Sequence, residues 1–253
     1  MDKKITLCAD DFGLNPSVNQ GILNLIDQGK LSATSCMTTM PLWPEAGAEL
    51  KKRRHQVQCG LHLNFTENTN VHLGKLMRQA FLQQLHPATL IDEITHQIEA
   101  FKAVMGDLPD FIDGHQHVHQ LPQIRQALLQ VYQHYYPQKT AWIRVSAQPQ
   151  WWRNFKSIKQ MIIAYSGGLT LRKILQQQGI PHNTSFAGIY NFNPKSNYAA
   201  LLQTFIQESQ EGGLIMCHPG LASADPEDTI YQTRALEYAV LSVHDVKELD
   251  HDL

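Results

Sequence analysis

The sequence has few cysteines, and the four that it contains lie far apart. Cys8, Cys36, Cys59 and Cys217 each sit in an apolar run, and no two of them form a Cys-x-x-Cys pair. Cysteine zinc sites usually show such short spacings, and disulfide frameworks belong mainly to small, cysteine-dense secreted domains. The sequence therefore predicts four reduced thiols in the core rather than a zinc site or a disulfide-stapled domain.

Long apolar runs and long basic runs are also absent. Only five mostly apolar residues separate the N-terminal Met1-Asp-Lys-Lys4 from Asp10, which is too few for a secretory signal, and no run approaches the ~20 apolar residues of a membrane span. The formal net charge is -2, and the only basic run is Lys51-Lys52-Arg53-Arg54. The sequence thus predicts a cytoplasmic protein that has no membrane span and does not bind nucleic acid.

Nucleotide-binding motifs and domain linkers are missing as well. No Gly-x-Gly-x-x-Gly follows the first apolar run, and there is no Walker loop and no internal repeat, which argues against dinucleotide and ATP use. No segment rich in Pro, Gly and Ser divides the 253 residues, of which 43% are hydrophobic. We therefore expect residues 1–253 to form one domain with a substantial core.

Short apolar runs alternate with amphipathic segments about seven times along the chain. The expected strands cover residues 5–9, 32–40, 57–64, 111–113, 141–145, 185–192 and 213–217. The expected helices begin at Asn15-Pro16 and cover 44–54, 87–105, 123–136, 171–178, 198–211 and 227–241, with a loop and then helix in 146–168. Such alternation favours a parallel sheet with helices outside it. The sequence predicts an α/β fold that forms a closed or distorted (β/α) barrel, with a doubly wound open sheet as the alternative.

The most informative stretch is Asp113-Gly-His-Gln-His-Val-His119. If it stays extended, Asp113, His115, His117 and His119 project to one side, because side chains alternate along a strand. Histidine is the commonest metal ligand and the usual acid or base near neutral pH. This pattern therefore indicates a metal or acid-base site at a strand end, although exposed loop histidines remain the simpler alternative.

Other polar groups fall at the ends of other expected strands. Asp10 and Asp11 end the first strand, His62 lies near the end of the third, and His218 follows the last. In a β/α barrel these ends share one face, and a carboxylate with two imidazoles is a sufficient ligand set for a divalent ion. Adjacent residues of a straight strand point to opposite faces, so Asp10 and Asp11 can share a site only if the chain bends there.

Four ordered motifs resemble those of the YdjC-like carbohydrate deacetylases, a family that includes chitooligosaccharide and hopanoid-biosynthesis-associated deacetylases. They are Asp10-Asp-Phe-Gly13, Gly60-Leu-His-Leu-Asn64, Asp113-Gly-His-Gln-His-Val-His119 and Cys217-His-Pro-Gly220, with a late Tyr231…Arg234…Glu237…Leu241 pattern. The resemblance implies a distorted (β/α) barrel of the polysaccharide-deacetylase type. The chain departs from the family in having Gly114, where Asp-Ser-His is frequent, and in a short loop after His62.

The resemblance also implies a function and a role for each residue. The protein would be a metal-dependent hydrolase that releases acetate from an N-acetylated amino sugar or short chitooligosaccharide. One divalent ion, Mg²⁺, Zn²⁺, Mn²⁺ or Co²⁺, would be held by Asp11, His62 and His115. The catalytic base would be Asp10 and the acid His218, as an imidazolium; His117 and Arg144 would lie near the substrate. Relatives of this kind also suggest a homodimer.

Two other readings of the same residues stay open. One is another metal-dependent amidohydrolase or phosphoesterase on the same barrel, although an early His-x-His and additional carboxylates would then be expected. The other is a non-catalytic protein that binds a sugar or a metal, for which neither Asp10 nor His218 would be needed. The sequence leaves open the substrate, the metal, and the roles of His119, Trp151 and Trp152.

Overall fold

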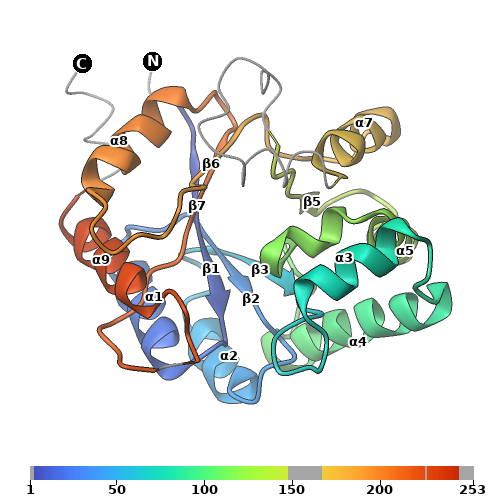
Figure 1. Cartoon of the computed structure of the whole chain (residues 1–253), viewed down its shortest axis with the longest axis horizontal. Coiled ribbons are helices and arrows are strands. Elements are labelled where there is room, and N and C mark those ends of the chain that lie inside the picture. Colours follow the sequence, from blue (N-terminus) through green and yellow to red (C-terminus); the bar gives the residue numbers. More distant parts are fainter. Residues whose placement is uncertain (1–2, 148–166, 226, 245–253) are drawn as a thin grey trace.

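The structure is a computed structural model that describes residues 3–147, 167–225 and 227–244. Seven parallel strands form its centre: β1 (Thr6–Phe12), β2 (Ala33–Cys36), β3 (Gln58–Leu63), β4 (Phe111–Gly114), β5 (Trp142–Ile143), β6 (Phe186–Ala187) and β7 (Leu214–Cys217). Their order is β5-β4-β3-β2-β1-β7-β6, so the strands of the curled sheet follow the chain cyclically (Figure 1). This confirms the predicted barrel type with about seven β/α units and excludes the doubly wound alternative.

The barrel is distorted because β5 and β6, the two ends of the strand order, are not paired as a ladder within the described residues. The segment before β6 bridges them instead. The Ile143 amide donates to the Pro181 carbonyl oxygen over 2.9 Å, and the Asn183 side chain bonds both the amide and the carbonyl of Val145. A single amide side chain thus takes part in closing the barrel where strand pairing stops.

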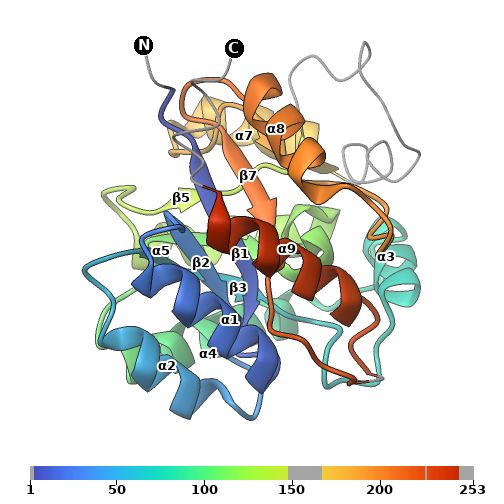
Figure 2. The same ribbon diagram turned by 90° about the vertical axis from the view of Figure 1, so that its left-hand side faces the viewer.

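Helices lie around the sheet in both views (Figures 1 and 2). Their bounds are α1 (Pro16–Asp27), α2 (Trp43–Lys51), α3 (Leu73–Phe81), α4 (Pro87–Met105), α5 (Pro122–Tyr135), α7 (Leu169–Gln178), α8 (Tyr198–Glu208) and α9 (Tyr231–Val243). Asn15 caps α1 as expected, since its side chain accepts from the Val18 amide. Helix α3 lies where no helix was predicted, and most of 146–168, with Trp151 and Trp152, falls outside the described residues.

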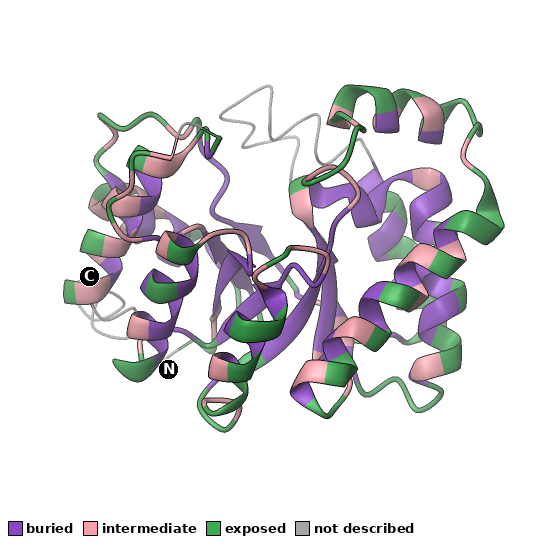
Figure 3. Ribbon diagram, turned by 90° about the horizontal axis from the view of Figure 1, so that it is seen from below, coloured by how far each residue is buried: buried purple, intermediate pink, exposed green. Residues whose placement is uncertain are grey.

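The core consists of the apolar strands and the inward faces of the helices, while the outer helix faces are exposed (Figure 3). The strands are buried along nearly their whole length, as expected for a parallel sheet covered by helices. Cys8, Cys36, Cys59 and Cys217 are buried and unpaired, which confirms the predicted thiols. No helix among the described residues combines the length and the apolar character that crossing a membrane requires.

The histidine stretch is not extended, so that conditional expectation was wrong. After β4 the chain enters a 3₁₀ turn, His115–Gln120, in which Gln116 and His117 have φ of 53° and 60°. The side chains of this stretch contact different partners: Asp113, still in β4, contacts His62, whereas in the turn His115 contacts Asp11 and His117 contacts Ser146. Three histidines at alternate positions therefore do not form one ligand set.

Candidate active site

The site begins with a break in β1. Its register against β2 shifts between Ala9 and Phe12, and Asp11 has a φ of 69°. A bulge of this kind re-aims a side chain, and Asp is one of the few residues that tolerate the left-handed region. Asp10 and Asp11 consequently line the same cavity although they are adjacent in sequence, and the bend that a shared site requires is present.

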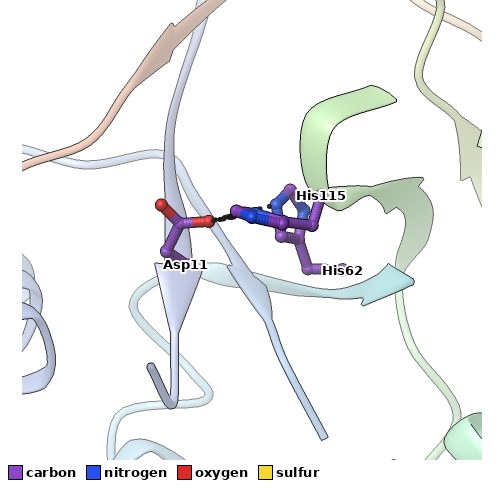
Figure 4. Close-up of side chains that lie close together, drawn as sticks. All are labelled: Asp11, His62 and His115. Atoms are coloured by element: carbon purple, nitrogen blue, oxygen red, sulfur yellow. Dashed lines mark hydrogen bonds and ion pairs between the residues drawn. The ribbon is translucent and has the colours of Figure 1, made fainter. Parts of the chain in front are cut away.

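Asp11, His62 and His115 come together from the carboxyl ends of β1, β3 and β4 (Figure 4). Asp11 Oδ1 lies 3.3 Å from His62 Nε2 and 2.9 Å from His115 Nδ1, and one ligand atom from each residue lies within 4.8 Å of the others. Metal bonds of about 2.1 Å imply neighbouring ligand atoms about 3.0 to 3.4 Å apart in octahedral or tetrahedral geometry. The spacing and the donor types of the three residues therefore fit a divalent ion.

Each histidine has a carboxylate on its other ring nitrogen. Asp113 Oδ1 is 2.7 Å from His62 Nδ1, and Glu67 Oε1 is 3.2 Å from His115 Nε2. Carboxylates in this position orient metal-binding histidines and fix their tautomer. The arrangement strengthens the case for a metal at Asp11, and neither carboxylate was assigned a role from the sequence.

Charge at the site also favours a cation. Ion pairs join Asp11 to Arg234, Arg234 to Asp228, and Arg144 to both Asp10 and Asp113. These four buried carboxylates face two guanidinium groups, which leaves two negative charges. A buried charge has to be compensated, and either protons on the adjacent histidines or a divalent cation in their place would supply that balance.

The excess of carboxylates also affects the protonation of His62. Burial disfavours a charged imidazole, but the carboxylates of Asp113, Asp10 and Asp11 outweigh it and raise the pKa of His62 to about 10. Burial likewise opposes ionisation of Asp11, but the charges of Arg234 and His115 hold its pKa well below the usual range. A proton on His62 therefore provides positive charge next to an ionised Asp11.

Asp10 is held by Arg144 through two contacts of 2.6 Å, Nη1 to Oδ2 and Nη2 to Oδ1. Arg144 is fully buried and does not line the cavity, so its contacts are those of a residue that positions Asp10 rather than one that touches a substrate. His119 helps to hold Arg144 in this position, because its Nε2 donates to the Arg144 carbonyl oxygen over 3.0 Å. This contact assigns a structural partner to His119.

Steric crowding explains why residue 114 is a glycine. A Cβ at this position would lie 3.0 Å from the His119 amide nitrogen and 3.1 Å from its Nδ1. A serine there would thus crowd the histidine that supports Arg144. The close packing of His119 against residue 114 therefore accounts for the glycine in place of the serine of the Asp-Ser-His pattern.

His117 and His218 both line the cavity and are both neutral at pH 7. Burial lowers the pKa of His117 well below its usual range, and its Nδ1 is 2.9 Å from Ser146 Oγ. Burial also lowers the pKa of His218 to about 4, against the opposing charges of Asp11 and Asp10. The expected imidazolium of His218 is therefore not the form that its surroundings favour.

The loop of His218 is held by Glu237 on α9. The His218 amide donates to Glu237 Oε2 over 2.5 Å, and the Tyr190 hydroxyl donates to Oε1 over 2.7 Å. One turn earlier on the same helix, Arg234 Nη2 contacts Asp11 Oδ2 at 2.8 Å. Both residues belong to the late pattern noted in the sequence, whose spacing of three puts them on one helix face, yet only the structure reveals their partners.

These groups surround a cavity of about 740 Å³. Its lining includes Asp10, Asp11, His62, His115, His117 and His218, so six of the seven predicted site residues meet there. The acidic residues Glu67, Asp225 and Glu227 also line it, whereas the only Lys or Arg among the described lining residues is Arg234, which is paired with Asp11 and Asp228. The described part of the cavity is therefore negatively charged.

Comparisons of the sequence with family models and with characterised proteins point to the same family. The model of the YdjC-like protein family matches residues 4–250. A chitooligosaccharide deacetylase of Yersinia pestis (strain Pestoides F) is 30% identical over 234 residues, which cover 87% of this chain and 82% of the relative. A similar deacetylase of Yersinia enterocolitica is 29% identical over 238 residues.

One solved structure agrees with this chain in fold. A protein of Enterococcus faecalis V583 that is named for cellobiose-phosphate cleavage superimposes with a TM-score of 0.71 and 20% identity, over 100% of this chain and 95% of its own. A family 4 carbohydrate esterase of Streptomyces lividans has a TM-score of 0.46 and 13% identity. The first match shows that the whole described architecture occurs in another protein.

Proposed function

The chain belongs to the YdjC-like family, and from this premise we propose that it is a metal-dependent deacetylase that hydrolyses the N-acetyl group of an amino sugar or a short chitooligosaccharide. The observation that carries the proposal is the ligand set Asp11, His62 and His115 in one cavity with Asp10 and His218. The names of the Yersinia relatives supply the class of substrate.

In the proposed reaction Asp11, His62 and His115 hold one divalent ion. Such an ion lowers the pKa of water and stabilises negative charge on a carbonyl oxygen. Asp10 accepts the proton of the attacking water, since it lines the cavity and Arg144 fixes both of its oxygens. His117 contributes a neutral polar ring to the substrate side of the cavity.

His218 donates a proton to the departing amine. Its pKa of about 4 means that the ring is a neutral imidazole at pH 7 and lacks the second proton of an imidazolium. His218 therefore takes up a second ring proton during the reaction, the one that Asp10 has accepted from the attacking water, and passes it to the amine. Acetate and a free amino sugar are the products.

The test is acetate release from N-acetylglucosamine, diacetylchitobiose and their phosphates, with Mg²⁺, Mn²⁺, Co²⁺ or Zn²⁺ and with a chelator. We expect metal-dependent release that Asp10→Asn lowers by at least about 100-fold, the scale of a lost general base. Asp92→Asn, on the exposed face of α4, is the matched control and should retain full activity.

Two outcomes would contradict the proposal. Hydrolysis of an aryl phosphate without any acetate release would favour a phosphoesterase. Thermal stabilisation by metal and by sugars without turnover would favour a binding protein, because the metal site would then be present without the reaction.

A further inference from the structure

Asp113 lies at the end of β4 and is fully buried. Its Oδ1 accepts from Ser35 Oγ over 2.5 Å and lies 2.7 Å from His62 Nδ1. Its Oδ2 forms an ion pair of 2.6 Å with Arg144 Nη2. One carboxylate thus contacts a proposed metal ligand through one oxygen and a buried arginine through the other.

The contact with His62 decides which ring nitrogen is free. Asp113 faces this ring as a carboxylate, because its Oδ2 forms an ion pair of 2.6 Å with Arg144 Nη2. A carboxylate can only accept, so His62 Nδ1 carries the hydrogen. In the neutral ring Nε2 then bears the lone pair, and it faces Asp11 Oδ1 at 3.3 Å.

The contact with Arg144 continues to Asp10. The same guanidinium that pairs with Asp113 binds both oxygens of Asp10 at 2.6 Å. Asp10 and Asp113 therefore share one cation, which is fully buried and whose backbone carbonyl is held by His119. An unbroken chain of contacts runs from His62 through Asp113 and Arg144 to Asp10.

We propose that Asp113 is a positioning residue that sets the metal-binding nitrogen of His62 and, through Arg144, the carboxylate of Asp10. The role toward His62 concerns metal binding alone. The role toward Asp10 rests on the deacetylase function proposed above. Asp113 is absent from the residues that line the cavity, so it acts through its neighbours and does not contact the substrate.

Asp113→Asn tests the proposal. An amide offers one acceptor oxygen where the carboxylate offers two, so either the contact with His62 or the one with Arg144 is lost. Removing a carboxylate behind a metal-binding histidine typically weakens metal binding by about 10- to 100-fold. We expect a loss of this size for Mn²⁺ and Zn²⁺, measured by isothermal titration calorimetry.

Asp110→Asn is the matched control. Asp110 precedes β4, pairs with Arg54 and accepts from the Cys59 amide, but contacts none of the proposed ligands. Its replacement should lower the melting temperature and leave the affinity for metal unchanged within about twofold. If Asp113→Asn bound both metals as tightly as Asp110→Asn does, the proposal would be wrong.

Ser35→Ala decides the case if Asp113→Asn does not fold. It keeps the charge of Asp113 and removes the hydroxyl that donates to Oδ1 and lies 3.1 Å from His62 Nδ1. We expect an affinity for Mn²⁺ and Zn²⁺ about two- to tenfold lower than that of the wild type, a fraction of the typical second-layer effect. An unchanged affinity would overturn the positioning role.

The positioning of Asp10 through Arg144 is tested by a separate measurement. Restoring full metal occupancy in Asp113→Asn with excess metal should leave kcat below the wild-type value and KM nearly unchanged, because the contact that links Asp113 to Arg144 and Asp10 is altered. Full recovery of kcat would remove the link to Asp10. Because metal affinity is read without turnover, a wild type that binds metal but releases no acetate would refute the deacetylase function alone.

Discussion

At the scale of single residues, the backbone at Asp11 determines what the site can be. Its positive φ and the register shift before Phe12 bring two consecutive carboxylates into one cavity. Asp and Asn tolerate this conformation better than β-branched or bulky residues do. The same carboxylate also meets Arg234 through Oδ2 and the histidines through Oδ1, so both its backbone and its two oxygens are specified.

Glu237 is a second residue with an unusual environment. Burial raises the pKa of its carboxyl to about 7, against the hydrogen bonds from the His218 amide and Tyr190 and the charge of Arg234. The titratable groups that interact with it are those of Arg234, Tyr190, Tyr198 and Cys217. Because the folded state binds this proton more tightly than the unfolded chain, the resulting stabilisation is complete below about pH 4.5 and disappears as the pH rises through 7.

Glu237→Gln should remove this pH dependence. The amide oxygen can still accept one hydrogen bond but the side chain cannot ionise. We expect the free energy of unfolding of the wild type, relative to Glu237→Gln, to fall by up to about 3 kcal/mol between pH 5 and pH 8. Urea unfolding at several pH values measures it, and a difference that is constant with pH would contradict the assignment.

At the scale of elements, the loop after β7 is held between two helices. The Gly220 amide donates to the Arg234 carbonyl oxygen on α9, and the Leu221 amide donates to that of Ser17 on α1. Gly21 of α1 approaches so closely that a Cβ there would lie 2.8 Å from Gly220 Cα. The position of His218 therefore depends on the absence of a side chain at Gly21.

Gly21→Ala should consequently destabilise the protein although alanine favours helices. The clash is with backbone atoms, which cannot rotate away, and overpacking of this kind costs about 1–3 kcal/mol. Gly74→Ala on α3 is the control, because nothing lies within 4 Å of its Cβ, and it should stabilise by at most about 1 kcal/mol. Urea unfolding of both variants gives the comparison, and equal stabilisation would refute the packing argument.

Elements with a strong apolar pattern were predictable. Helix α4 has the predicted bounds, because Leu90, Ile94, Ile98 and Phe101 repeat at helical spacing and are buried. Helix α3 was missed although Leu73, Leu76, Met77, Ala80 and Phe81 recur at helical spacing, because the helix is short and no side-chain cap marks its N-terminus. The turn after Asp113 was missed for another reason, since its left-handed residues are not glycines.

At the scale of the whole molecule, the barrel depends on a seam without strand pairing. Asn183 is buried there and makes three hydrogen bonds: from the Val145 amide, to the Val145 carbonyl and to the Ser185 carbonyl. They substitute for a ladder between β5 and β6. The side chain of Asn183 therefore shares the closure of the barrel with the bond between the Ile143 amide and the Pro181 carbonyl oxygen.

Asn183→Ala should cost about 2–4 kcal/mol, because it leaves the amide and the carbonyl of buried Val145 without these partners. The exposed Asn191 accepts one bond of 3.3 Å from the Asn193 amide, so Asn191→Ala should change stability by less than about 0.5 kcal/mol. Thermal or urea unfolding measures both. Equal effects would show that the seam is closed by other contacts.

The strand-end residues of the site could be predicted because the carboxyl ends of parallel strands meet on one face whatever the details of packing. The residues that these side chains contact could not be predicted. Glu67, Arg234 and Glu237 lie on a loop and on a helix far along the chain, and only tertiary packing brings them to His115, Asp11 and His218. Arg144 shows the same limit: its place at the end of β5 is visible in the sequence, but its pairing with Asp10 is not.

For the proposed deacetylation, the acidic lining of the cavity has a consequence for the order in which the products depart. Deacetylation converts an uncharged amide into an anion and a cation. Glu67, Asp225 and Glu227 would repel acetate and attract the new ammonium group, since charges in a cleft act over several ångströms. The small anion should then leave first, while the amino sugar lingers and competes with the next substrate molecule, more strongly at low ionic strength than at high.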